Sequence, residues 1–375
     1  MIEQRIAVEV DRDGVVQAHS PSDNSHSPEG KVSLAGLDAD VIKLFERWLT
    51  LRDREWREGE IRVFGSLLHR YLFADPVWFF IESHIEAPGT DRTRLELIFP
   101  PEPPYSRLAA IPWEYLYRPA RFTDSGSFLA ADRRIVLSRY IRLRRGEPRL
   151  APLENPRMLT VISQPDDRRL GEVVYDDVLD AIREWARRRG VSLSELHNPT
   201  AAHLHEAVVP ADGNGPDLVH FMGHGEFDPD LGAGSLALAD PDGAADWVAD
   251  QDVAQIFSRG GAAPRAVVLH SCEGGRADFS ASFAGLAPQL ALSGVQCVVA
   301  MQYAVTNETA TAFSISLYEH LATGCDLDVA VQEARWQIGS LSASRDPRLL
   351  GIPVVYMQNR SGLFSGTPPE RGEDA

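Results

Sequence analysis

Lysine, cysteine and long hydrophobic runs are all scarce in this 375-residue sequence. Lysine occurs only at positions 31 and 43, so arginine supplies nearly all of the positive charge. The 54 acidic residues outnumber the 37 basic ones, and the net charge is −17. A chain this acidic lacks the clustered Lys and Arg that sequence-independent binding to nucleic acid or to an anionic membrane requires. The composition therefore predicts that neither is a partner.

The sequence contains no apolar run of about 18 residues, which predicts that it has no membrane span. Its first ten residues alternate polar and apolar side chains and lack the basic and apolar regions of a signal peptide. Three cysteines are too few for a disulfide scaffold and fit a reducing compartment. Together these features predict a cytoplasmic location.

The first 150 residues predict small, mixed elements. Apolar segments on both sides of Asp13-Gly14 indicate a hairpin, and the Ser- and Pro-rich stretch 19–31 indicates a linker that lets this hairpin move. Helical periodicity predicts helices over about 38–51 and 58–73. Short apolar segments between proline clusters in 77–145 predict a small α+β module with antiparallel strands.

From about residue 157 onward, strands and helices alternate. Because the strands are nearly continuous runs of Val, Ile and Leu, the pattern predicts a mostly parallel sheet with helices on both faces. We therefore expect an α/β fold with this organisation: hairpin and linker 1–37, α+β module 38–148, α/β domain 149–360 and polar tail 361–375.

Two of the predicted strands end in residues that carry chemistry. The strand at 217–222 is followed by Gly223-His224-Gly225, and the strand at 265–270 by Ser271-Cys272. The carboxyl ends of parallel strands lie at one edge of a sheet, where function gathers. If the two strands are neighbours, His224 and Cys272, which lie 48 residues apart in sequence, face each other across a cleft.

A paired imidazole and thiol suit nucleophilic catalysis. A free thiol has a pKa near 8.5, so an imidazole nearby is needed to take its proton and later to protonate a leaving amine. The backbone N–H groups of Gly225 and Cys272 are candidates for an oxyanion hole, in which each donor contributes roughly 3 kcal/mol. His224 and Cys272 are therefore the candidate base and nucleophile.

A zinc site is the competing interpretation. His220, His224, His270 and Cys272 are all possible ligands, but a strand followed by a glycine-bounded loop does not aim four side chains at one point. Cys297 lies within a buried strand pattern, and Cys325 has no evident partner. Phosphate-binding, dinucleotide-binding and nucleophile-elbow motifs are lacking, so we expect no cofactor and no metal.

Three sequence stretches resemble the CHAT domain, a caspase-like, clan CD type family of cysteine peptidases. They are LVHFMGHGEF, VVLHSCEGG and the long stretch that begins at VQCVVAM, and IPWEYLYRP also looks like a segment of this family. The resemblance covers roughly residues 90–358. It implies a caspase-like fold, a catalytic dyad of His224 and Cys272, and cleavage of a protein substrate in a bacterial cytoplasm. It also implies activation by a partner in trans, as in antiviral defence or regulated proteolysis.

The resemblance also implies a substrate pocket. Its residues would come from the loop that begins at Gln164, from the position two before Cys272 and from the end of the strand at 295–301. The candidates are Asp166, Asp167, His270 and Gln302. Acidic residues in that pocket would favour Arg or Lys before the scissile bond, although acidic residues at these positions more often start the following helix or lie in solvent.

A catalytically silent adaptor with the same fold is the alternative function. The intact His–Cys pair argues against it, because a scaffold has no need of a thiol at that strand end.

Overall fold

The computed structural model describes most of the chain. The described residues are 3–32, five helical positions (41, 44, 45, 48 and 49), 56–100, 108–109, 111–118, 126–141, 153, 155–168, 170–228, 233–258, 263–271, 285–303, 305–341 and 346–358. Most of the expected helix at 38–51 and the whole tail 361–375 lie outside them. No helix in these ranges is both long and apolar enough to cross a membrane.

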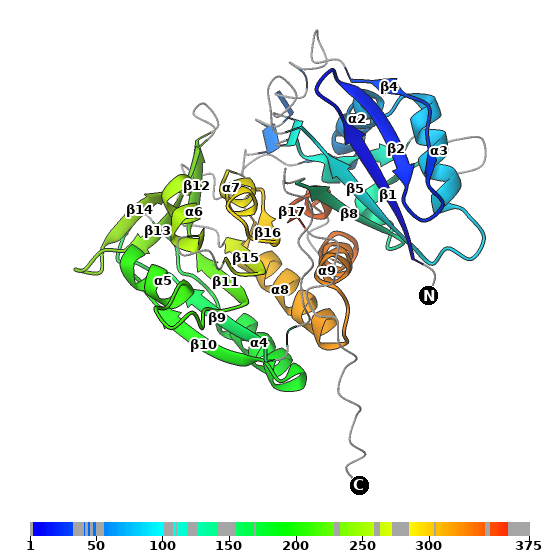
Figure 1. Cartoon of the computed structure of the whole chain (residues 1–375). Helices are drawn as coiled ribbons and strands as arrows, with labels where there is room; N and C mark the ends of the chain where they lie inside the picture. Colours follow the sequence, from blue (N-terminus) through cyan, green and yellow to red (C-terminus); the bar gives the residue numbers. More distant parts are fainter. Residues whose placement is uncertain are drawn as a thin grey trace. The chain divides into compact units, whose positions relative to one another are not determined.

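The chain divides into two compact units, one made of residues 1–142 and 335–355 and the other of 143–334 and 356–375 (Figure 1). The elements of the first unit are β1 (Glu3–Val10), β2 (Val15–Ser20), β3 (Ser25–His26), β4 (Gly30–Lys31), α2 (Glu58–Leu72), α3 (Asp75–Ile85), β5 (Arg92–Ile98), η2 (Trp113–Tyr115), β6 (Tyr117–Arg118), β7 (Ser127–Phe128), η3 (Leu129–Ala131), β8 (Ile135–Tyr140) and η4 (Leu349–Gly351).

The sheet of the first unit corrects the expectation of antiparallel strands in 77–145. In it β8, β5 and β1 are parallel neighbours, and the expected antiparallel pairing is found between the short strands β6 and β7. The apolar segment at 77–85 forms α3, which begins with Asp75-Pro76 and therefore has proline in its first turn, where the ring fits a helix. The expected hairpin is confirmed as β1 and β2, joined through Gly14 at φ 75°.

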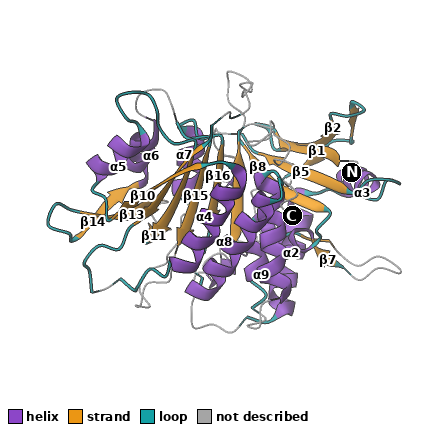
Figure 2. Ribbon diagram, turned by 90° about the horizontal axis from the view of Figure 1, so that it is seen from below, coloured by secondary structure: helices purple, strands orange, loops and turns teal. Residues whose placement is uncertain are grey.

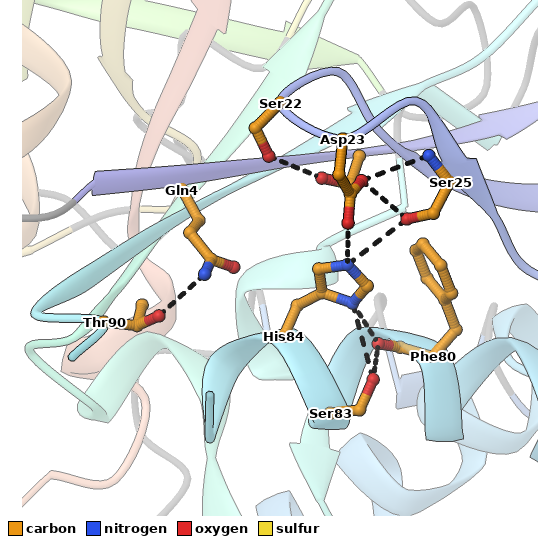
Figure 3. Close-up of polar contacts among 9 residues, drawn as sticks. Gln4, Ser22, Asp23, Ser25, Phe80, Ser83, His84 and Thr90 are labelled. Carbon is orange, nitrogen blue, oxygen red and sulfur yellow. Dashed lines mark hydrogen bonds and ion pairs between the residues drawn. The ribbon is translucent and has the colours of Figure 1, made fainter. Parts of the chain in front are cut away.

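Residues 19–31 are not a free linker. β3 and β4 both pair with β2, and the turn between β2 and β3 is fastened to α3 (Figure 3). The Asp23 carboxylate accepts a 2.7 Å hydrogen bond from the Ser25 hydroxyl and lies 3.6 Å from Nε2 of His84. The hairpin and the elements after it thus form one unit, without the boundary that we expected at residue 37.

A buried ion pair lies at the centre of the first unit. Glu114 is 0% exposed, and Arg139 donates to its carboxylate through Nε at 3.1 Å and through a second N–H. Arg139 also donates to the Ala109 carbonyl at 2.7 Å. Arg335 is 0% exposed, donates to the Pro353 carbonyl at 2.8 Å, and has its pKa lowered to about 10 by burial. Glu114 therefore compensates buried positive charge.

The second unit contains a parallel sheet and a smaller antiparallel one. Its elements are β9 (Arg157–Ile162), α4 (Asp176–Arg189), β10 (Ser192–His197), α5 (Ala201–Val208), β11 (Leu218–Gly223), β12 (Gly225–Asp228), β13 (Ala233–Ala239), β14 (Ala245–Ala249), α6 (Asp250–Ser258), β15 (Ala266–Ser271), α7 (Leu286–Leu292), β16 (Cys297–Met301) and α8 (Asn307–Ala322). Two further elements, α9 (Leu327–Leu341) and β17 (Pro353–Met357), contribute residues to both units.

Strands of the larger sheet follow the order β10-β9-β11-β15-β16, and all their pairings are parallel. Figure 2 shows α4 and α8 on one face and α5, α6 and α7 on the other. The predicted α/β class, a mostly parallel sheet covered on both faces, is confirmed. Gly190 ends α4 in the left-handed conformation at φ 64°, which glycine adopts readily at the end of a helix.

Replacing Glu114 by alanine tests the buried ion pair. The substitution leaves the Arg139 guanidinium buried without its carboxylate, and we expect the free energy of unfolding to fall by about 3–5 kcal/mol. Urea titration measures this change. Glu58→Ala, which removes the exposed partner of Arg62, is the matched control and should change the midpoint far less. Equal effects of the two substitutions would contradict this role of Glu114.

Candidate functional site

The two strand ends singled out in the sequence are direct neighbours. β11 and β15 pair in parallel, with Met222 opposite His270 and Gly223 opposite Ser271. His224 and Cys272 are the next residues along the chain from the last of these pairs. Cys272 itself lies outside the described residues, as do 273–284. The condition that the two strands are neighbours is therefore met.

The end of β11 is packed too tightly for a side chain at position 223. A Cβ atom on Gly223 would lie 2.8 Å from the Phe221 ring and 3.0 Å from the carbonyl oxygen of Ser163. The neighbouring β9 segment thus passes close to the backbone of β11, with the Ser163 N–H donating to the Met222 carbonyl at 2.8 Å. Glycine at this position, directly before His224, therefore allows the close approach of the two strand ends.

His224 is held at both its backbone and its ring. His224 is only 2% exposed, and its backbone carbonyl accepts a hydrogen bond from the Ala237 N–H of β13 at 3.0 Å. Nε2 lies 2.9 Å from the carbonyl oxygen of Gly171. A carbonyl can only accept, so Nε2 carries the hydrogen, and in the neutral imidazole Nδ1 is then the basic nitrogen.

Sequence reasoning missed Gly171. The helix that follows β9 begins at Asp176, and the loop before it presents the Gly171 carbonyl to His224. The contact cannot be predicted from residue types, because the acceptor is a backbone carbonyl and 53 residues separate the two partners. Only the fold brings this loop to the end of β11.

Two further histidines are buried beneath the strand ends. Nδ1 of His220 lies 2.6 Å from the Tyr318 hydroxyl, and Nδ1 of His270 lies 2.8 Å from the Ser314 hydroxyl. Both partners belong to α8, and the two imidazole rings lie 5.7 Å apart. Burial lowers the pKa of His270 to about 4 and that of His220 well below its usual range. Both histidines are therefore neutral and tie the two strands to α8.

These contacts bear on the zinc alternative. His220 and His270 direct Nδ1 towards α8 hydroxyls, whereas His224 directs its Nε2 towards the Gly171 loop. Among the residues that the structure describes, no three His, Cys, Asp or Glu side chains are grouped in a way that could hold a metal ion. Cys272, the fourth ligand of that alternative, is outside this set.

The other candidate residues lie around the same end of the sheet. Gly225 begins β12 and pairs with Leu236 of β13. Asp166 is exposed, and its N–H donates to the Gly243 carbonyl at 2.8 Å. Asp167 is half-buried, and Gln302, directly after β16, is only 4% exposed. Neither aspartate belongs to α4, which starts nine residues after Asp167 in sequence.

Comparison with known proteins decides the family. The CHAT domain matches residues 64–349, about three quarters of the chain. The chain belongs to the CHAT-domain family. No curated protein matches this CHAT domain.

Three solved structures that are similar to this CHAT domain are distant from it in sequence. The Arg-specific cysteine proteinase gingipain R is 13% identical, with a TM-score of 0.45 and coverage of 80% of this chain and 74% of that one. Caspase-1 from Spodoptera frugiperda is 11% identical, with a TM-score of 0.40 and coverage of 59% and 97%. The Saccharomyces cerevisiae separase–securin complex is 11% identical at a TM-score of 0.44, and the match spans 95% of this chain but only 30% of that one.

The buried His270 predicts a dependence of stability on pH. The unfolded chain takes up a proton on this imidazole near its ordinary pKa of 6.5, whereas the folded chain does so only near 4. Between these two pH values the unfolded state binds more protons than the folded state. The contribution of His270 to the free energy of unfolding is therefore intact above pH 6.5 and falls by about 1.4 kcal/mol per pH unit towards pH 4.

Urea midpoints measured from pH 7 to 4 check this expectation. His270→Asn removes the titrating group and should make the acid-side decline shallower, while the exposed His203→Asn should leave it unchanged. A decline of the same steepness in both variants would show that His270 is not responsible.

Proposed function

We propose that this CHAT domain is a caspase-like cysteine endopeptidase in which Cys272 is the nucleophile and His224 the base. The observation that carries the proposal is the parallel register that pairs Gly223 with Ser271. Paired positions on neighbouring strands are about 4.8 Å apart, so Gly223 and Ser271, which directly precede the two proposed functional residues, end their strands side by side.

The proposed reaction follows from the protonation state of His224. Nδ1 takes the thiol proton, and the Cys272 thiolate attacks the scissile carbonyl to form a tetrahedral intermediate. Its oxyanion is bound by the N–H groups of Gly225 and Cys272. The imidazolium then protonates the leaving amine, a thioester forms, and water assisted by His224 hydrolyses it. The Gly171 carbonyl strengthens its hydrogen bond to Nε2–H whenever the ring is charged.

The proposal extends to a preference for basic residues before the scissile bond. Asp166 and Asp167 lie in the loop that also presents Gly171, and Asp166 is exposed. A carboxylate there would pair with an Arg or Lys of the substrate. His270 and Gln302 are 1% and 4% exposed, so they would shape the pocket from beneath its surface.

Activation by a partner, in a bacterial defence or regulated-proteolysis pathway, completes the proposal. It rests on the family resemblance alone. Co-expression with the products of neighbouring genes, followed by mapping of new protein termini, tests it. Cleavage should depend on the partner and should be lost in Cys272→Ala.

Labelling of the thiol distinguishes the peptidase from the alternative, a catalytically silent adaptor. If the protein is a peptidase, a peptide electrophile with arginine next to the reactive group should label Cys272, and labelling should disappear in Cys272→Ala. An adaptor predicts no such selective labelling. In His224→Ala, labelling and peptide cleavage should fall by about 10²- to 10⁴-fold, because the general base is lost.

The protein supplies its own control thiols for that labelling experiment. Cys297 is buried, and burial raises its pKa, while Cys325 is partly exposed. Cys325→Ala should leave the labelling unchanged. Labelling of Cys325 at the rate of Cys272 would favour the adaptor, since the proposed nucleophile would then have no special reactivity.

A further inference from the structure

The side chain of Gln164 holds the loop that meets His224. Its Nε2 donates to the Gly171 carbonyl at 3.1 Å, and its Oε1 accepts from the N–H of Val173. The same Gly171 carbonyl accepts from Nε2 of His224 at 2.9 Å. A carbonyl oxygen has two lone pairs, so one amide and one imidazole use both of them.

Gln164 is itself fixed from the opposite side. Its backbone N–H donates to Oδ1 of Asn198 at 2.7 Å, and the Asn198 N–H donates to the Ile162 carbonyl at 2.8 Å. Asn198 has a positive φ of 44°, a conformation that asparagine tolerates better than most residues. The ends of β9 and β10 thus define where the Gln164 side chain begins, independently of the loop that it holds.

We propose that Gln164 is a positioning residue that selects the protonation form of His224 through the Gly171 carbonyl. This inference rests on the proposed role of His224 as the base. With the loop held, Nε2–H has a fixed acceptor and Nδ1 remains the basic nitrogen. Without the amide, the carbonyl is free to turn away, and the form with hydrogen on Nδ1, which cannot take a proton from a thiol at that atom, becomes populated.

The loop has a second support, so loss of the Gln164 amide should not unfold it. Nδ2 of Asn307, the first residue of α8, donates to the Glu172 carbonyl at 3.3 Å. This contact fixes the residue after Gly171 but does not direct the Gly171 carbonyl. The effect of removing the amide should therefore be on His224, with little change in overall stability.

Nitrogen NMR of protein labelled with ¹⁵N-histidine tests the proposal without any need for activity. The His224 resonances are assigned by their absence in His224→Gln, and their shifts report which ring nitrogen carries the hydrogen. In the unchanged protein we expect hydrogen on Nε2. In Gln164→Met we expect a mixture of the two forms, and in the matched control Gln251→Met, on the exposed side of α6, no change.

A second variant covers the case in which methionine disturbs the loop. Gln164→Glu keeps an acceptor for the Val173 N–H but has no N–H for Gly171, and it should give the same mixture. Hydrogen on Nδ1 in the unchanged protein, or hydrogen that stays wholly on Nε2 in both folded variants, would overturn the proposal.

The pH dependence of Cys272 alkylation gives a separate readout. Gln164→Met should slow alkylation by about five- to tenfold near neutral pH and shift its pH profile, as expected for loss of one positioning hydrogen bond. If Cys272 is alkylated equally slowly in the unchanged protein, in His224→Gln and in Gln164→Met, the proposed peptidase activity is contradicted. The NMR result would still decide whether Gln164 positions His224.

Discussion

The parallel pairing of β11 with β15 is the constraint on which the whole site depends. It sets Gly223 opposite Ser271, so that the two chemically distinctive loops start from neighbouring positions at one edge of the sheet. The buried apolar strands make this register difficult to shift, because a slip by one residue would turn every side chain to the other face. Residues far apart in sequence are therefore held together by the core.

The surroundings of His224 show how a fold controls an imidazole. Its backbone is fixed by β13, its ring donates to a loop carbonyl, and the strand that carries it is tied to α8 by His220. His270 ties the neighbouring strand to the same helix. Buried, neutral histidines of this kind are structural, although their position next to the candidate dyad makes them resemble ligands in a sequence.

The sequence was sufficient for the parts of the fold that depend on periodic burial. Apolar runs and their turns located β9, β11, β15 and the helices after them, and the glycines located the strand ends. It failed where tertiary contacts decide the outcome. The apolar segment that forms α3 reads equally well as a strand, and the Ser- and Pro-rich stretch 19–31 becomes ordered only because β2 and α3 supply partners. Backbone acceptors such as Gly171 leave no signal in a sequence at all.

A crystal structure of the protein after reaction with an arginyl peptide electrophile tests the central claim most directly. The account predicts a covalent bond to Sγ of Cys272, with Nδ1 of His224 within about 4 Å of that sulfur and Nε2 still on the Gly171 carbonyl. An adduct on Cys297 or Cys325 alone, or an imidazole directed away from a modified Cys272, would contradict it.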